Sequence, residues 1–320
     1  MTSSRARWLA VADDLTGSAD TGSPFAERGY SSCIWLHGQP PLAECDVPVL
    51  ETTSRHCAPE EAYRRVREAI ERYRRPGDRV FKKLDSTWKG NLGAELQAVH
   101  DATGAEVLLA PAHPRMGRTL CGGELLVHGE PTGLRLATLL AQQGLTDTPW
   151  LRVFETLDDV PDDGEAYAGS GGLAQRIAAK LPALDAPPVE DAPREVTVII
   201  GSDQMATRRQ RERLIETGWP GRIVDVRHES LDGPMFAEAC SRLQGALVIC
   251  GGDTAIAVAD HLGARGIRLR GEQIPGLPWG WWMGGRLDGE RVATKSGGFG
   301  GIETIVEAVR LIACKGDMRV

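Results

Sequence analysis

Trp8-Leu-Ala-Val-Ala-Asp-Asp-Leu-Thr-Gly17 is the stretch of sequence from which the fold can be predicted. Its four apolar residues, Leu9–Ala12, predict a strand that is buried on both faces. Asp13 and Asp14 end this strand, and a helical pattern follows with Thr16 as the expected N-cap. Open α/β sheets bind their ligands at such strand ends. Taken alone, however, the Asp pair is better explained as one helix cap and one solvated acid.

Length, composition and charge exclude several classes of protein. The chain has 320 residues, enough for two domains, and 42% of them are hydrophobic, enough for a substantial core. The net charge is −7 and no run of Lys and Arg predicts a nucleic-acid surface. No apolar stretch approaches the ~20 residues that span a bilayer. The N-terminus has no signal or transit peptide, so we expect a cytoplasmic protein.

Cysteine and histidine spacing predicts neither disulfides nor a zinc site. The number of Cys is seven, which is odd, and no Cys-x-x-Cys occurs. The seven His show no metal-ligand spacing, and the sequence names no metal ligand. A Walker P-loop is absent from the sequence, so a nucleotide site has to be of another kind.

Strand and helix patterns alternate along both halves of the chain. In the first half we expect strands near 8–13, 31–37, 47–52, 79–84 and 106–110, and helices near 17–28, 58–74, 90–102 and 133–143. The stretch 146–168 is expected to be surface connection, and the Pro-rich stretch 181–194 a linker. A second alternating pattern begins at Val196. We therefore expect two Rossmann-like three-layer αβα domains, 1–185 and 186–320, with mostly parallel sheets and an active site in the cleft between them.

Polar turns follow the expected strands of the first half. They are Asp13-Asp14, Thr52-Thr-Ser-Arg55, Lys82-Lys-Leu-Asp-Ser-Thr-Trp-Lys-Gly90 and Pro111-Ala-His-Pro-Arg-Met-Gly-Arg118. Because the carboxyl ends of parallel strands share one edge of a sheet, these side chains are expected to converge on one crevice. Arg and Lys pair with carboxylates, and Asp, Ser and Thr bind hydroxyl groups. Each turn alone is ordinary capping chemistry, but together they predict a site for a small polyhydroxylated anion.

Glycine-rich turns follow the expected strands of the second half. They are Gly201-Ser-Asp203, Gly251-Gly-Asp-Thr254 and Lys295-Ser-Gly-Gly-Phe-Gly300. Glycine lets a backbone approach a ligand closely, and the amides at a helix N-terminus favour phosphate. A cation beside such amides neutralises charge in phosphoryl transfer. The Trp-rich segment 275–282 is explained either as a cover for adenine or, at least as well, by packing against its own domain.

The motifs, in their order along the chain, resemble the four-carbon acid sugar kinase family. They are Ala12-Asp-Asp-Leu-Thr-Gly17, Ser54-Arg55, Lys82-Lys-Leu-Asp-Ser-Thr87, Pro111-Ala-His-Pro114 with Gly117-Arg118, Gly169-Ser-Gly-Gly-Leu-Ala174, Gly201-Ser202 with Ala206-Thr-Arg-Arg-Gln210, Gly251-Gly-Asp-Thr254, Pro275-Gly-Leu-Pro278 and Lys295-Ser-Gly-Gly-Phe-Gly300. The set covers nearly the whole chain. Any one motif is a weak signal, but the ordered set is specific.

The resemblance implies an ATP-dependent kinase that phosphorylates a small sugar acid such as threonate, erythronate or 2-oxo-tetronate. It implies that the N-terminal domain holds the acid and that the C-terminal domain holds ATP with Mg²⁺. The residues implied for the acid are Asp13, Asp14, Arg55, Lys83, Asp85, Ser86 and Lys89. Those implied for the nucleotide are Ser202, Gly251, Gly252, Asp253, Thr254, Gly297 and Gly298.

Four features depart from the family pattern. Trp88-Lys89 replaces Leu-Arg, so the compact ammonium of Lys89 takes the place of the planar, bidentate guanidinium that is usual in the family. His113 replaces a Phe, and Asp253 replaces a longer Glu. The chain is also shorter than typical members, with the missing part after Gly129, which leaves the size and identity of the substrate open.

In the mechanism that we expect, a substrate hydroxyl attacks the γ-phosphorus of ATP in line, so positioning and charge neutralisation dominate. Asp14 or Asp85 orients or deprotonates this hydroxyl, and the sequence does not choose between them. Lys295 or Lys83 stabilises the transferring group, and Mg²⁺ bridges the phosphates, held mostly by water. A hinge near residues 181–194 is expected to close over the substrates.

Three alternatives stay open. The first is a non-catalytic protein that binds a sugar acid or a nucleotide on the same scaffold. The second is a kinase for a different small hydroxy acid. A dinucleotide-dependent dehydrogenase is weaker, because Gly-x-Gly-x-x-Gly does not follow the first strand. As partners we expect a small-molecule substrate and neither nucleic acid nor membrane, with a homo-oligomer left open.

Overall fold

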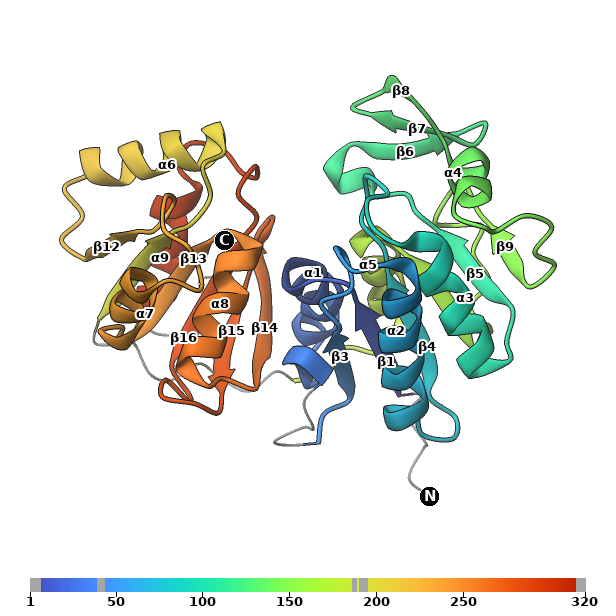
Figure 1. The fold of residues 1–320 in the computed structure, drawn as a ribbon, viewed down its shortest axis with the longest axis horizontal. Coiled ribbons are helices and arrows are strands. Elements are labelled where there is room, and N and C mark those ends of the chain that lie inside the picture. Colours follow the sequence, from blue (N-terminus) through green and yellow to red (C-terminus); the bar gives the residue numbers. More distant parts are fainter. Residues whose placement is uncertain (1–6, 39–43, 186–188, 190–194, 315–320) are drawn as a thin grey trace.

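The N-terminal half of the chain is organised around a parallel sheet (Figure 1). Its strands are β1 (Trp8–Ala12), β2 (Ser32–Trp35), β3 (Val47–Glu51), β4 (Arg79–Lys83), β5 (Val107–Ala110), β9 (Leu151–Val153) and β10 (Ala166–Gly169). They pair in the order β2-β3-β1-β4-β10-β5-β9. The helices are α1 (Leu15–Glu27), α2 (Pro59–Tyr73), α3 (Leu92–Thr103), α4 (Leu136–Gln142) and α5 (Gly171–Lys180). This computed structural model describes residues 7–38, 44–185, 189 and 195–314.

The C-terminal half adds a second group of strands and helices. Its strands are β11 (Val196–Ile200), β12 (Arg222–Asp225), β13 (Ala246–Cys250), β14 (Gly266–Ile274), β15 (Leu277–Met283) and β16 (Arg291–Lys295). Its helices are α6 (Met205–Glu216), α7 (Pro234–Ser241), α8 (Gly252–Leu262) and α9 (Thr304–Ala313). The order is β12-β11-β13-β16-β15-β14, with antiparallel pairing only around β15 and β14 in this described part. The expected alternation of strands and helices is therefore confirmed in both halves.

One sheet of 13 described strands runs through both halves, because β14 pairs with β2. The pairing is antiparallel, with Gly266 opposite Trp35 and Arg268 opposite Cys33. A parallel sheet that ended at β2 would leave an open row of backbone groups, and β14 covers that edge. The two halves therefore share a sheet, whereas separate sheets were expected. The predicted boundary between residues 185 and 186 and most of the predicted hinge lie outside the described residues.

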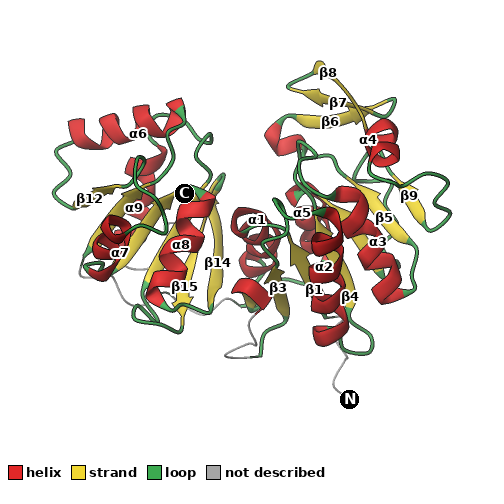
Figure 2. Ribbon diagram, viewed as in Figure 1, coloured by secondary structure: helices red, strands yellow, loops and turns green. Residues whose placement is uncertain are grey.

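Helices cover both faces of this sheet (Figure 2). One cluster of buried apolar residues extends through both halves, with members on α1, α5, α7 and α8. A second cluster packs α2 and α3 against the N-terminal strands, and a third packs α6 and α9 against the C-terminal strands. In the described part of the chain, no helix is long and apolar enough to cross a membrane.

Several described strands were not predicted. The expectation of surface connection over 146–168 was wrong in two places, at β9, which pairs with β5, and at the central strand β10, which lies between β4 and β5. Its sequence, Ala-Tyr-Ala-Gly, has little strand propensity, and pairing on both sides outweighs this. Residues 118–135 form a separate antiparallel sheet of β6 (Arg118–Cys121), β7 (Glu124–Val127) and β8 (Glu130–Arg135). The Trp-rich segment is β15, and Trp279 and Trp282 are buried in the protein's own core.

Gly22 of α1 lies where the two halves of the sheet join. A Cβ at this position would come within 2.4 Å of Leu269 Cδ1 on β14 and 2.6 Å of Ser32 Oγ on β2. We predict that Gly22→Ala lowers the free energy of unfolding by about 1–3 kcal/mol, because overpacking outweighs the gain in helix propensity. Urea unfolding measures the change. Gly301→Ala, where an added Cβ meets nothing within 4 Å, is the control. An equally stable Gly22→Ala would show that the joint is loosely packed.

Candidate active site

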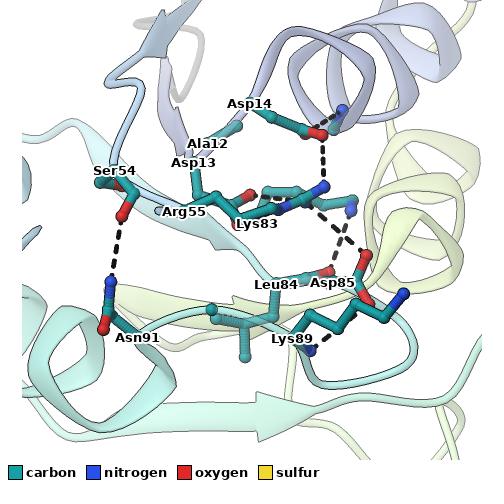
Figure 3. A network of polar contacts seen from close by, with 12 residues as sticks. Ala12, Asp13, Asp14, Ser54, Arg55, Lys83, Leu84, Asp85, Lys89 and Asn91 are labelled. Atoms are coloured by element: carbon teal, nitrogen blue, oxygen red, sulfur yellow. Dashed lines mark hydrogen bonds and ion pairs between the residues drawn. The ribbon is translucent and has the colours of Figure 1, made fainter. Parts of the chain in front are cut away.

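A cluster of carboxylates around one guanidinium lies at the carboxyl ends of three neighbouring strands (Figure 3). Asp13 and Asp14 follow β1, Arg55 follows β3, and Asp85 follows β4. β1 lies between β3 and β4 in the sheet. The structure thus brings together these side chains, which the sequence placed at one edge.

Arg55 contacts all three carboxylates. Its Nε and Nη2 donate to Asp13 Oδ2 and Oδ1 at 2.8 and 3.1 Å. Its Nη1 donates to Asp14 Oδ2 at 2.5 Å, and its Nη2 lies 3.7 Å from Asp85 Oδ2. Burial alone would lower the pKa of Arg55, but the charges of Asp14 and Asp13 raise it above its usual value. The guanidinium therefore holds the three turns together as a permanent cation.

Asp13 is the buried member of the cluster, with 3% of its surface exposed. Burial raises its pKa, yet the positive charges of Lys82 and Arg55 outweigh this and bring the pKa below its usual value. Beneath it, Lys82 Nζ and Glu95 Oε2 form a buried ion pair at 2.9 Å, and Ser54 Oγ donates to Glu95 at 2.5 Å. Asp13 is therefore an ionised support for Arg55 within a buried network.

Asp14 is the N-cap of α1, so the expectation of Thr16 as the cap was wrong. Asp14 Oδ1 accepts from the Gly17 amide at 2.7 Å, and Asp14 Oδ2 accepts from Thr16 Oγ1 at 2.8 Å and from Arg55. The helix begins at Leu15, so the residue that precedes it, Asp14, has the extended backbone of a cap. Both of its oxygens are thus occupied.

Asp85 keeps one carboxylate oxygen with few contacts. Its Oδ1 accepts from the amide and hydroxyl of Thr87 at 2.8 and 2.5 Å, whereas its Oδ2 faces Arg55 at 3.7 Å. Burial raises its pKa, but the hydrogen bonds from Thr87 and the charge of Arg55 bring it below its usual value. Asp85 is therefore an ionised acceptor with a side chain 21% exposed.

Three further predicted residues surround this cluster. Lys83 is buried, and its Nζ donates to the Leu84 carbonyl at 2.9 Å. A Cβ on Gly17 would lie 3.4 Å from Lys83 Nζ, so glycine leaves room for the ammonium beside the start of α1. Ser86 accepts a hydrogen bond from Arg118. Lys89 is exposed, with its amide 3.5 Å from Asp85 Oδ1.

The glycine-rich turns of the C-terminal half also meet one another. A Cβ on Gly201 would lie 1.9 Å from Thr254 Oγ1, and one on Gly297 would lie 1.8 Å from Ser202 Oγ. Gly251 has a φ of 124°, which side chains rarely tolerate, and its amide donates to the Lys295 carbonyl at 2.9 Å. In the turns after β11, β13 and β16, the backbone of a glycine in one turn therefore packs against a side chain of another turn. Asp253 is exposed in the first turn of α8, and a Cβ on Gly298 would meet nothing within 4 Å.

The ammonium of Lys295 is buried under its own loop. Lys295 Nζ donates to the carbonyls of Ser296 at 2.7 Å, Phe299 at 2.9 Å and Gly297 at 3.3 Å. Burial lowers its pKa below the usual value. In this structure Lys295 holds the glycine-rich loop in place, and its role beside a transferring phosphate stays a prediction.

The two groups of turns come together where α8 begins against α1. A Cβ on Gly252 would lie 3.6 Å from Thr16 Cγ2, which is ordinary van der Waals contact. A second contact between the halves joins His37 Nε2 to Asp260 Oδ1 at 2.8 Å. The N-termini of two helices, α1 and α8, one from each half, therefore lie side by side.

Two further polar residues, Asp20 of α1 and His113 in the turn after β5, lie near Gly171 of α5, and neither was among the predicted site residues. Asp20 is on the same face of α1 as Gly17, at the spacing of i and i+3, which is the signal that could have identified it. Burial raises the pKa of Asp20, opposed by Lys83 and reinforced by Asp14 and Asp85. His113, in the turn after β5, was noted only as a departure from the family pattern.

Comparison with known proteins assigns both halves. A family model described as a sugar-binding N-terminal domain matches residues 8–149, and one described as a nucleotide-binding C-terminal domain matches residues 233–305. The chain belongs to the four-carbon acid sugar kinase family. This confirms the predicted family and an ATP-dependent kinase of four-carbon sugar acids.

Curated relatives of this kinase span its whole length. The chain is 29% identical to a D-threonate kinase of Salmonella typhimurium over 420 aligned residues, covering 96% of this chain and 98% of the relative. It is 29% identical to a D-threonate kinase of Bordetella bronchiseptica, covering 94% and 96%. A D-erythronate kinase of Heliobacterium modesticaldum is 44% identical over 132 residues, which cover 38% of this chain and 30% of the relative. Because the first alignment is longer than the 320-residue chain, part of that relative has no counterpart here.

Two crystal structures share the fold of the kinase. One, from Salmonella typhimurium, has a TM-score of 0.77 at 20% identity and covers 96% of this chain and 100% of its own. The other, from Haemophilus influenzae, has a TM-score of 0.72 at 19% identity and covers 95% and 100%. They confirm the predicted α/β architecture of two halves.

Removal of Arg55 tests its part in the site. We predict that Arg55→Met lowers the free energy of unfolding by about 3 kcal/mol, because Asp13 then loses its partner while it stays buried. Arg64→Met is the matched control, since the ion pairs of Arg64 with Glu61 and Glu68 lie on the surface and contribute little to stability. Denaturant unfolding at pH 7 measures both. Equal losses in the two variants would contradict a central role for Arg55.

Proposed function

We propose that the kinase transfers the γ-phosphate of ATP to a hydroxyl group of D-threonate or a stereoisomer of it, in the crevice between α1 and α8. The observation that carries this is the close approach of Gly252 to Thr16, where an added Cβ would lie 3.6 Å from Thr16 Cγ2, because it brings the glycine-rich turn after β13 near the carboxylate–guanidinium cluster. The full-length relatives act on D-threonate, which supports that class of acid. We further propose that the first 185 residues bind the acid and the remainder binds ATP.

The substrate carboxylate needs a cation, and the N-terminal turns offer two near the crevice. Lys83 lies beside Gly17 at the start of α1, and Arg55 lies between the carboxylates. Arg55 already donates hydrogen bonds to Asp13 and Asp14. Lys83 and the amides at the N-terminus of α1 are therefore left to attract the acid. Lys89 at the rim adds a positive charge that can reach the same ligand.

Asp85 rather than Asp14 orients the reacting hydroxyl in this proposal. Both oxygens of Asp14 accept hydrogen bonds within the fold, whereas Asp85 Oδ2 has only Arg55 as a described neighbour, at 3.7 Å. Phosphoryl transfer needs positioning more than a strong base, so an ionised carboxylate with a lowered pKa suits the task.

ATP is assigned to the turns that contain Ser202, Gly251, Gly252, Thr254 and Gly297. Their glycines let the backbone amides and the first turn of α8 face a phosphate. Lys295 keeps the third turn in place from below. In the described residues, no group of three or more His, Cys, Asp and Glu side chains is placed to hold a metal ion.

This donor set fits Mg²⁺ held mainly by phosphates and water, which needs only one or two carboxylates. Asp253, exposed beside Gly252, supplies one such oxygen donor. The ion would neutralise charge on the phosphates, while the protein supplies position and exclusion of water.

Two substitutions separate the roles of the acids. Asp85→Asn is predicted to lower kcat for D-threonate about 100-fold with little change in thermal stability, because only the orienting oxygen is lost. Asp14→Asn is predicted to lower the stability by about 1 kcal/mol through the helix cap, with a smaller loss of kcat. Steady-state assays and thermal melts give both values. A large loss of kcat in Asp14→Asn alone would reverse the assignment.

The nucleotide assignment is tested at Gly252. An added methyl group there is tolerated sterically, since its nearest contact is 3.6 Å, yet it occupies space in front of the helix amides. We predict that Gly252→Ala weakens binding of ADP at least about tenfold while the melting temperature is preserved. Calorimetric titration measures the affinity, with Gly301→Ala as the control. An unchanged dissociation constant would remove the nucleotide from this turn.

A further inference from the structure

The glycine-rich loop that follows β16, residues 296–301, turns its first carbonyl groups toward a buried ammonium. Lys295 is 0% exposed, and its Nζ donates to the carbonyls of Ser296 at 2.7 Å, Gly297 at 3.3 Å and Phe299 at 2.9 Å. A buried ammonium is costly unless its donors are used. These contacts therefore fix both the lysine and the first part of the loop.

Gln210 of α6 holds the second part of the same loop. The side chain is buried, with 1% of its surface exposed, and its Nε2 donates to the carbonyls of Phe299, Gly300 and Gly301 at 3.0, 3.1 and 2.8 Å. Its Oε1 has no hydrogen-bond partner in the described part of the protein. The opposite orientation of the amide group would place Oε1 against three carbonyl oxygens, so the loop determines how Gln210 lies.

Thr207 lies one turn before Gln210 on the same face of α6, at the spacing of i and i+3. It is 0% exposed, and its Oγ1 donates to the Gly297 carbonyl at 2.6 Å and accepts from Lys295 Nζ at 3.4 Å. Both residues belong to the motif Ala206-Thr-Arg-Arg-Gln210, and neither was among the predicted site residues. Two buried donors of α6 thus hold the loop, one near each of its ends.

The amides of the loop point the other way. In a planar trans peptide, the carbonyl of one residue and the N–H of the next point in opposite directions, and no described peptide bond is cis. The inward carbonyls of Ser296, Gly297 and Phe299 therefore turn the amides of Gly297, Gly298 and Gly300 outward. These three amides donate no hydrogen bond to any described residue. Gly298 and Gly300 are exposed, and a Cβ on Gly298 would meet nothing within 4 Å, so the outer side of the loop is open.

The loop lies beside the turns that we assign to ATP. β16 pairs with β13, and the amide of Gly251, which precedes α8, donates to the Lys295 carbonyl at 2.9 Å. A Cβ on Gly297 would lie 1.8 Å from Ser202 Oγ in the turn after β11. A row of unpaired amides with an ammonium behind it is a binding surface for an anion.

We propose that Gln210 and Thr207 are positioning residues for the phosphates of ATP. They hold the carbonyls of the loop inward, so that the amides of Gly297, Gly298 and Gly300 bind phosphate oxygens. Neither side chain touches the nucleotide. When either donor is lost, peptide groups of the loop can turn, and a carbonyl oxygen then faces the phosphate and repels it. This inference rests on the proposed function and deepens its nucleotide site.

The test replaces Gln210 by Met, which keeps the length of the side chain and removes its donors. Calorimetric titration gives the affinity for ADP, and competition with a fluorescent ADP analogue gives that for adenosine, which has no phosphate. Gln210→Met is expected to weaken ADP at least about tenfold and to leave the dissociation constant of adenosine within about twofold. In steady-state assays, KM for ATP should rise by a similar factor while KM for D-threonate is preserved.

Thr207→Val is the second variant, since it keeps the shape of the side chain and removes the hydroxyl. It is expected to weaken ADP about threefold with adenosine unchanged. The matched control is Gln97→Met on α3, because the Nε2 of Gln97 donates only to Asp101 at the surface. Every affinity should be preserved in this control. Thermal melts show which variants are folded, and Thr207→Val decides the matter if Gln210→Met is not.

The ratio of the two affinities distinguishes positioning from a merely structural role, because general damage to the C-terminal half weakens adenosine and ADP alike. Equal losses for both ligands overturn the positioning role, and so does an unchanged affinity for ADP in the folded variants. Either result leaves the proposed function intact if the wild type binds ADP and Gly252→Ala weakens that binding. A wild type that binds no ADP removes the proposed nucleotide site together with this inference.

Discussion

The ion pairs of Arg55 with Asp13 and Asp14 are the interaction on which the site depends. They connect the turns after β1 and β3, and the same guanidinium faces Asp85 after β4. Without a cation at this place, three carboxylates at the ends of adjacent strands would repel one another and would gain protons instead of staying ionised. Arg55 thereby connects the three strand ends, and Asp85 Oδ2, at 3.7 Å, is the carboxylate oxygen that it holds least closely.

The second constraint is the pairing of β14 with β2, which makes one sheet of two halves. In this shared sheet the turn after β13 lies beside α1, where a Cβ on Gly252 would come within 3.6 Å of Thr16 Cγ2. α1 packs against β14 as well as against its own β1 and β3, and Gly22 permits that close approach.

Much of this arrangement could be predicted from residues alone. A parallel sheet was predicted from the buried apolar run before Asp13. Its polar edge was predicted from the turns with Arg55 and Asp85, because the carboxyl ends of parallel strands lie at one edge of the sheet. Three features could not. β10 has weak local propensity, and only pairing on both sides makes it a strand. The cap shifted from Thr16 to Asp14 because the exact start of a helix depends on competing local hydrogen bonds. Asp20 lies near Lys83 and α5 through its face of α1, and this neighbourhood appears only in the folded structure.

The acids around α1 fall into two sets with opposite electrostatics. Asp13 and Asp85, on the side of Arg55 and the lysines, have lowered pKa values. On the side of β14, burial and the neighbouring Asp20 and Glu27 raise the pKa of Glu272 to about 8. Environments that give neighbouring acids different pKa values are typical of active sites, where one group is ionised and another is protonated. In the proposed crevice the ionised Asp13 and Asp85 are neutralised by fixed cations, whereas burial raises the pKa values of Asp20 and Glu272. Such a crevice can accept a negatively charged acid beside a negatively charged nucleotide without a large excess of negative charge of its own.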